Sequence, residues 1–149
     1  MRRLINTILT MAAVVAAVVS CDIETSGNGD LDGMWHLRTV DTLATTGSCD
    51  MKEHRIYWSF QHDLMKLDDL TGNNASLLMR FNNAGGKLIL SSPYIYNRED
   101  GDEPMTEEQL PMLYPFGVHS LNETYDVIKL SSSSMILQSG TLRLSFKKI

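Results

Sequence analysis

The chain has 149 residues, a formal net charge of −5 and 43% hydrophobic residues. This length suits a single domain with one core. An acidic surface repels the phosphates of nucleic acids and anionic lipid headgroups, so the composition argues against a nucleic-acid-binding protein.

The first twenty residues have the pattern of a secretory signal. Arg2 and Arg3 precede an uncharged, mostly apolar run over residues 4–19, as in the n-region and h-region of a signal peptide. A transmembrane helix needs about 20 consecutive apolar residues, and Asp22 and Glu24 follow this run too closely. We therefore predict a signal peptide over residues 1–20 that is cleaved and not retained.

Residues 18–21, with the sequence VVSC, resemble the lipobox of bacterial lipoproteins. By this resemblance, Cys21 receives diacylglycerol and becomes the first residue of the mature chain, which holds the protein on a membrane of the cell envelope. We expect the outer membrane and leave its periplasmic and surface faces open. The alternatives are an ordinary signal peptide cut nearby and a membrane anchor that is never cut.

Cleavage before Cys21 leaves 129 of the 149 residues and, without Arg2 and Arg3, changes the formal charge from −5 to −7. With Cys21 acylated, Cys49 is the only remaining thiol, so no internal disulfide can form. Without acylation, a Cys21–Cys49 bridge is the alternative for an exported chain. Residues 21–30 are polar and rich in glycine, which predicts a flexible tether, and the folded domain is expected over residues 31–149.

Most of this domain alternates apolar and polar residues with the period of half-buried strands. Ile56, Trp58 and Phe60, for example, share one face of a predicted strand. A Gly-containing turn over residues 82–86 predicts a hairpin. The pattern gives about eight strands, drawn from residues 34–40, 54–61, 63–70, 76–81, 87–92, 94–97, 125–131, 135–139 and 141–149.

A short helix is expected near residues 105–112. Thr106 is a candidate N-cap, with Gln109 three residues later as its capping-box partner. Pro111 lacks the N–H needed to continue an α-helix. We therefore predict one or two helical turns, followed by a loop through residues 114–117.

Many short antiparallel strands predict either a closed barrel or a two-sheet sandwich. The sequence GMW, from Gly33 to Trp35, opens the first strand directly after the tether and resembles the Gly-x-Trp signature of lipocalins. Together with the lipobox and the final LRLSFKK, it makes the chain similar to the small lipocalin-like lipoproteins of Gram-negative gut bacteria, most of which have no assigned function. The resemblance implies an all-β, antiparallel up-and-down barrel of about eight strands.

The same resemblance implies that Gly33 and Trp35 close one barrel end. In lipocalins a late arginine packs over this tryptophan, and only Arg143 is available for that part. Arg143 alternates with Leu142 and Leu144, so it could instead face solvent.

The inward positions of such a barrel either fill its interior or line a cavity. The residues expected there are bulky and apolar: Trp58, Phe60, Leu77, Met79, Phe81, Leu88 and Leu90. Ordinary core packing explains them as well as a ligand does. Two hypotheses follow: a lipid-anchored protein that binds a small hydrophobic or amphiphilic molecule, and a non-enzymatic interaction module or accessory subunit of an envelope complex, with a filled core.

No pattern in the sequence predicts catalysis, a cofactor or a metal site. The histidines show no metal-ligand spacing: His36, His54, His62 and His119. The acidic residues 97–103 do not fit a calcium-binding loop and are expected to be solvated. The carboxylate of Asp50 beside Cys49 disfavours a thiolate nucleophile, and no nucleophile elbow, phosphate-binding loop or dinucleotide turn is present. We therefore predict that the protein is not an enzyme.

Overall fold

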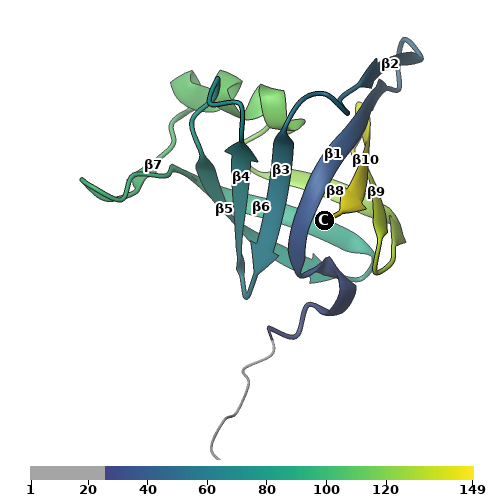
Figure 1. The fold of residues 1–149 in the computed structure, drawn as a ribbon, viewed down its shortest axis with the longest axis horizontal. Coiled ribbons are helices and arrows are strands. Elements are labelled where there is room, and N and C mark those ends of the chain that lie inside the picture. Colours follow the sequence, from purple (N-terminus) through teal and green to yellow (C-terminus); the bar gives the residue numbers. More distant parts are fainter. Residues whose placement is uncertain (1–25) are drawn as a thin grey trace, which may run out of the picture.

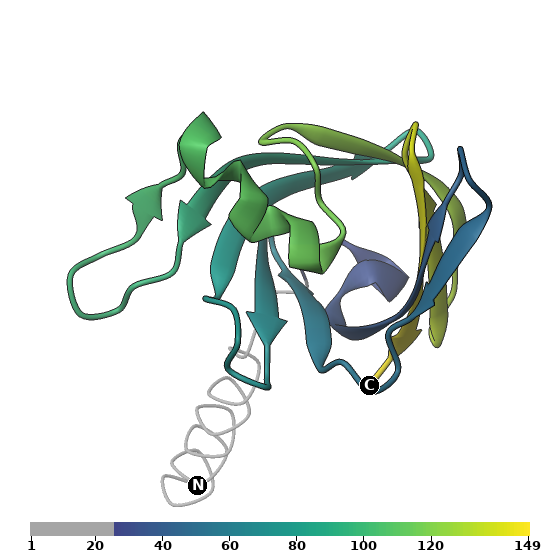
Figure 2. The ribbon, with the colours of Figure 1, turned by 90° about the horizontal axis from the view of Figure 1, so that it is seen from above.

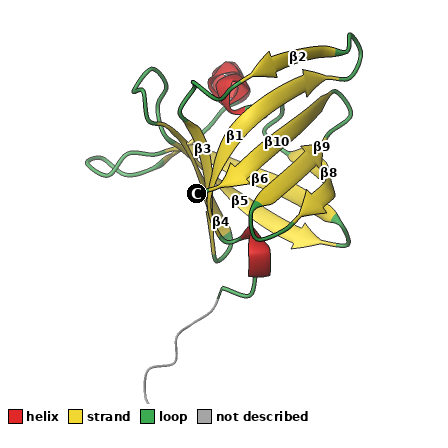
Figure 3. Cartoon of the chain, turned by 45° about the vertical axis from the view of Figure 1, so that its right-hand side comes forward, coloured by secondary structure: helices red, strands yellow, loops and turns green. Residues whose placement is uncertain are grey.

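The computed structural model describes residues 26–149. The predicted signal peptide, Cys21 and the first part of the tether lie outside these residues. The described chain contains ten strands and two 3₁₀ helices (Figures 1 and 3): η1 (Gly29–Leu31), β1 (Gly33–Thr42), β2 (Gly47–Asp50), β3 (Ile56–Gln61), β4 (Leu64–Asp69), β5 (Leu77–Ala84), β6 (Lys87–Ile95), β7 (Glu103–Pro104), η2 (Glu107–Phe116), β8 (Glu123–Leu130), β9 (Ser134–Gln138) and β10 (Leu142–Lys148).

The strands form a closed antiparallel barrel, seen from one end in Figure 2. Its eight strands are β1, β3, β4, β5, β6, β8, β9 and β10, and the pairing of β10 with β1 completes the ring. β2 pairs with the second half of β1, and β7 pairs with the end of β6. The predicted all-β up-and-down barrel is confirmed, and the sandwich alternative is excluded because a sandwich has no such closing pair.

Local turn chemistry explains much of the strand order. Gly85 and Gly86 form the two-residue loop between β5 and β6 with φ angles of 62° and 74°. Two successive positive φ angles give the hairpin turn whose twist matches that of the strands, which confirms the hairpin predicted over residues 82–86. The separate segments expected at 87–92 and 94–97 are one strand, β6, which continues through Ser92 despite its φ of 49°.

The helical segment differs in length and type from the prediction. η2 is a 3₁₀ helix that continues to Phe116, past Pro111 and Pro115. The predicted capping contact forms, since the Thr106 N–H donates to Gln109 Oε1 at 2.9 Å. An α-helix would stop where a proline removes its hydrogen bond, whereas a proline fits the start of a new short turn because its N–H is not needed there. η2 covers the upper end of the barrel in Figure 1.

The opposite end of the barrel is closed by η1 and Trp35. The Trp35 Nε1–H donates to the Leu31 carbonyl at 2.8 Å, and both side chains are buried. Lys148 pairs with Trp35 across β1 and β10, with its Nζ 5.1 Å from the tryptophan ring centroid. Arg143 pairs instead with Asp41, far along the strand. Lys148 therefore occupies the position expected for Arg143, because strand register and not residue type decides which cation reaches the ring.

Gly33 fits this closed end for a steric reason. Its φ is 105°, and an added Cβ would lie 3.1 Å from Lys148 Cε. A side chain at this position would strain the backbone and displace the lysine from Trp35.

Among residues 26–149, no helix is both long and apolar enough to cross a bilayer.

Candidate functional site

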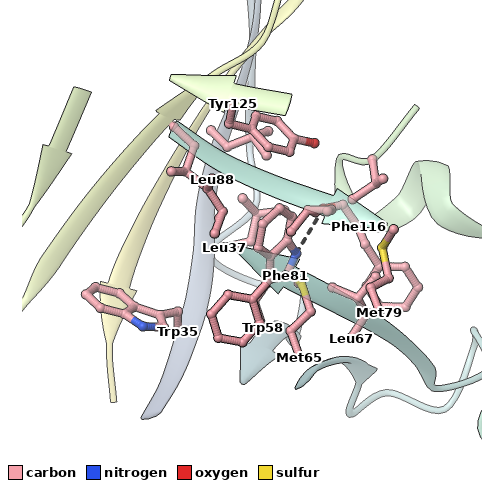
Figure 4. Close-up of a cluster of buried hydrophobic side chains, with 14 of the residues drawn as sticks. Trp35, Leu37, Trp58, Met65, Leu67, Met79, Phe81, Leu88, Phe116 and Tyr125 are labelled. Carbon is pink, nitrogen blue, oxygen red and sulfur yellow. Dashed lines mark hydrogen bonds between the residues drawn. The ribbon is translucent and has the colours of Figure 1, made fainter. Parts of the chain in front are cut away.

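The barrel interior holds all seven residues predicted to line a cavity. Trp58, Leu77, Met79, Leu88 and Leu90 have no exposed surface, and Phe60 and Phe81 are buried as well. The structure thus brings these residues together from three strands, β3, β5 and β6. Figure 4 labels four of them: Trp58, Met79, Phe81 and Leu88. Whether they also contact a ligand remains a prediction.

Aromatic side chains fill the centre of this interior. The Trp58 ring lies 4.8 Å from the Phe146 ring, 5.9 Å from Tyr125 and 6.2 Å from Phe60, measured between centroids. Phe60 in turn meets Phe81 edge-on at 5.0 Å. These separations are those of directly packed rings, so the centre of the barrel is occupied by the chain itself.

η2 closes the upper end over these rings and provides their polar partners. Trp58 Nε1–H donates to the Phe116 carbonyl at 3.1 Å, drawn as the dashed line in Figure 4. The Tyr125 hydroxyl donates to the Gly117 carbonyl at 2.8 Å. Burial, helped by nearby Glu123, raises the pKa of Tyr125 far above its ordinary value, so the hydroxyl stays protonated as a donor. We call residues 113–118 the plug, because Leu113, Phe116 and Val118 are all fully buried.

A small pocket of about 280 Å³ lies beside the plug. It contains none of the seven predicted residues and is lined by Met51, His54, Arg55, Ile56, Asp69, Thr71, Asn73, Asn74 and Pro115. Asp69 accepts hydrogen bonds from the Thr71 N–H and hydroxyl and from Asn74, at 2.6–2.8 Å. Its carboxylate is thus used to hold the β4–β5 loop, which leaves little free chemistry in this pocket.

A larger depression, of about 1080 Å³, lies on the outside of the barrel. We call it the outer groove. Ligand pockets usually measure roughly 300–1,000 Å³, so this volume is sufficient for a small molecule. Its lining comes from the N-terminal segment, β1, β3, β4, β5 and the segment after β6: Ser26, Asp32, Gly33, Met34, Ser59, Phe60, Gln61, His62, Asp63, Leu64, Met65, Lys66, Leu78, Tyr96, Arg98 and Asp102.

Strand register explains the floor of the outer groove. Met34, Ser59, Lys66 and Leu78 are paired in sequence across β1, β3, β4 and β5, so they form one row on the outer face. Leu64 belongs to the neighbouring row, and its side chain is 38% exposed. Apolar side chains therefore lie on a surface that strand alternation normally makes polar.

One rim of the groove is polar and aromatic. Lys66 Nζ lies 4.5 Å from the Tyr96 ring centroid and 2.9 Å from an Asp68 carboxylate oxygen. The Arg98 guanidinium carbon lies 5.5 Å from the same ring, and its Nε donates to the Tyr96 hydroxyl. The segment that carries Arg98 projects away from the barrel beside β7 in Figure 1. This rim can offer cationic donors and an aromatic edge to a polar group.

The other end of the groove is built by the N-terminal segment. Asn28 Nδ2 donates to Asp32 Oδ1 at 2.9 Å and to the His62 carbonyl at 2.7 Å. Ser26 donates to the second oxygen of Asp32. Residues 26–32 are thereby held against the β3–β4 turn, so the described part of the predicted tether is one wall of the groove.

The other predicted features stay apart or solvated. Residues 97–102 form an exposed turn in which Asp102 accepts from the Asn97 N–H at 2.9 Å. His36 is buried, stacks on Tyr57 and hydrogen-bonds the His54 carbonyl at 2.8 Å. Cys49 is an exposed free thiol. Over residues 26–149, no three metal-ligating side chains gather at one point.

Of the seven residues predicted to line a ligand site, only Phe60 also lines the outer groove. The alternating pattern was used to select inward positions, whereas most of this lining lies on the outer face. A signal was nevertheless present: the pairs Leu64–Met65 and Leu77–Leu78 place apolar residues on both faces of neighbouring strands. Such pairs indicate an outer surface that something covers. The contribution of Tyr96 and Arg98 could not be read from the sequence, since it depends on where the segment after β6 turns.

An eight-stranded barrel with a tryptophan-closed base defines a lipocalin-like protein. The family model described as a lipocalin-like domain matches residues 15–149. The chain therefore belongs to the lipocalin-like domain family, which confirms the resemblance.

Two solved structures share the fold. A lipocalin-like protein from Bacteroides uniformis ATCC 8492 superposes with a TM-score of 0.61 at 22% identity, over 81% of this chain and 100% of that one. An uncharacterized protein from Bacteroides eggerthii DSM 20697 gives 0.53 at 15% identity, over 80% of this chain and 99% of that one. A search of curated proteins gave no match.

Proposed function

We propose that this chain is a lipid-anchored binding protein of the cell envelope, held by Cys21 on the outer membrane, and that it binds a small amphiphilic molecule in the outer groove. The observation that carries the proposal is the apolar floor of a groove of about 1080 Å³ on the outer face of the barrel. The packed interior serves as a rigid support, and no catalytic step is involved.

The chemistry of the groove suits a molecule with two kinds of surface. Met34, Leu64 and Leu78 offer apolar contact area, and burying a methylene there contributes about 0.8 kcal/mol. Arg98, Lys66 and Tyr96 along the rim offer donors and an aromatic ring. A few polar groups beside an apolar floor are the usual composition of a small-molecule site.

A matched pair of substitutions tests the groove. The probe is a fluorophore-labelled dodecanoic acid, and its binding to the mature chain carrying Cys21→Ala is followed by fluorescence anisotropy. Leu64→Glu should raise the Kd at least tenfold, because it removes apolar contact and places a charge beside the hydrocarbon; tenfold corresponds to about 1.4 kcal/mol.

The control for this test is Ile89→Glu. Ile89 is 42% exposed, against 38% for Leu64, and lies on β6 outside the groove lining. Its substitution should leave the Kd unchanged. Equal effects at both positions, or no saturable binding by the parent, would refute the proposed site.

The anchor has its own test. Cys21→Ala in the full chain should move the protein from the membrane pellet to the soluble fraction or stall it with its signal uncleaved. A single acyl chain holds a protein only marginally, whereas two or three hold it stably. A processed Cys21→Ala protein that stays in the pellet would contradict the lipid anchor.

A second candidate function is protein recognition, favoured by the filled interior and by the projecting segment between β6 and η2 (Figure 2). Native mass spectrometry of the protein purified from its own envelope separates the two. A co-purified small amphiphile supports the first proposal, and a stoichiometric protein partner supports an accessory subunit of an envelope complex.

A further inference from the structure

We infer that the outer groove opens toward the membrane that carries the chain, and that its occupant is the acyl chain of a lipid from that membrane. The inference rests on the proposed anchor and the proposed groove function. It adds the source and chemical class of the occupant and the orientation of the barrel.

The first step concerns the wall of the groove. Ser26 and Asp32 both line it. Asn28 ties this segment to the β3–β4 turn through the His62 carbonyl at 2.7 Å, and Lys148 Nζ donates to the Asp30 carbonyl at 2.8 Å. The segment is thus attached to the barrel at two points. The folded part of the chain therefore includes the groove wall at Ser26 and does not start at residue 31.

The second step is the length of chain that is left. Cys21 precedes Ser26 by five residues. Whatever their conformation, five residues span at most about 18 Å, because an extended chain rises no more than about 3.6 Å per residue. An acylated Cys21 therefore holds the Ser26 end of the groove within about 18 Å of the lipid surface.

The third step compares this reach with the size of the barrel. β1 has ten residues, and a strand of that length extends roughly 33 Å at about 3.3 Å per residue. η1 and the β3–β4 turn lie at the lower end of the barrel in Figure 1, and η2 lies at the upper end. The short tether keeps the lower end at the membrane, so the plug and the small pocket beside it face away.

The fourth step is the chemistry at the membrane end. Leu64 lies directly after the β3–β4 turn, is 38% exposed, and belongs to the same floor as Met34 and Leu78. Ser59 and Lys66 lie between Met34 and Leu78 in this row, so the floor offers a hydrocarbon chain separate apolar contacts that begin beside the lipid surface. A water-soluble ligand would gain nothing from this placement, so an acyl chain is the occupant that both the floor and the tether fit.

The test uses the acylated full chain in vesicles of phosphatidylethanolamine and phosphatidylglycerol that contain a radiolabelled phospholipid. A photocrosslinking amino acid replaces Leu64 in one protein and Ile89 in another. We expect lipid crosslinks at position 64 at least fivefold above those at position 89. Similar yields at the two positions would overturn the inference, because the groove would then be no closer to acyl chains than the rest of the barrel.

A second arm changes only the tether. Twenty Gly and Ser residues inserted between Thr25 and Ser26 add a flexible linker with a root-mean-square span of about 22–27 Å. Crosslinking at position 64 should then fall at least threefold, while solution binding of the labelled dodecanoic acid by the corresponding Cys21→Ala chain stays the same. If crosslinking at position 64 does not change with tether length while solution binding is intact, only the membrane-facing orientation is overturned. If the chain does not bind the labelled dodecanoic acid in solution, the proposed function of the groove is overturned.

Discussion

Replacing Trp58 by alanine is expected to lower the free energy of unfolding by about 3–5 kcal/mol, the usual cost of removing a large buried aromatic side chain. Trp58 has no exposed surface and packs against rings from β8 and β10. Its loss would also leave the Phe116 carbonyl without the indole donor. The measurement is urea denaturation of the mature Cys21→Ala chain, in which the midpoint and slope of the transition give the free energy of unfolding.

Trp58→Phe is the matched control for this change. It keeps an aromatic ring in the interior and removes the Nε1–H that reaches Phe116. The expected loss is smaller, about 1–3 kcal/mol for an unpaired buried acceptor. If Trp58→Ala cost under about 1 kcal/mol, the tryptophan would border empty space, since a side chain facing a void has few contacts to lose. The interior would then again be the better candidate for ligand binding.

A packed interior changes where binding is expected in this lipocalin-like chain. The seven residues expected at inward positions are all buried, because period-two alternation fixes which side of a strand each residue occupies. The alternation of apolar and polar residues does not show whether side chains from opposite sides of the barrel touch across its interior. Here Trp58 spans the interior to Tyr125 and Phe146, and η2 closes the end above them, so packing is a property of the whole ring of strands.

The features that sequence reasoning missed share one physical origin. The position of Lys148 over Trp35 and the outer row from Met34 to Leu78 both depend on the register between neighbouring strands. Local propensity carries no information on such register. The 3₁₀ continuation of η2 past Pro111 is a different case, because burial of Leu113 and Phe116 overrides the helix-breaking tendency of proline.

Replacing Trp35 by alanine is expected to cost a similar amount, about 3–5 kcal/mol, at the opposite end of the barrel. Trp35 has no exposed surface, and its Nε1–H satisfies the Leu31 carbonyl at 2.8 Å. Its removal would open the base and release η1. Urea denaturation of Trp35→Ala beside Trp58→Ala compares the two ends directly, and comparable large losses are the result expected for an interior that is filled throughout.

The partner of Trp35 can be identified in the same experiment. Lys148→Met removes a cation 5.1 Å from the ring centroid and the donor to the Asp30 carbonyl, and should cost about 1–2 kcal/mol, the sum of a cation–π contact and one hydrogen bond. Arg143→Met should change stability by less than about 0.5 kcal/mol, since Arg143 lies opposite Asp41 in the strand register, away from Trp35, and its buried Nε has no hydrogen-bond partner. The reverse order of the two stability losses would place Arg143, and not Lys148, over Trp35.

Lys148 also joins the last strand to the N-terminal segment through its hydrogen bond to the Asp30 carbonyl. Lys148→Met should therefore loosen the wall of the outer groove and weaken the binding of dodecanoic acid, while Arg143→Met should leave this binding unchanged.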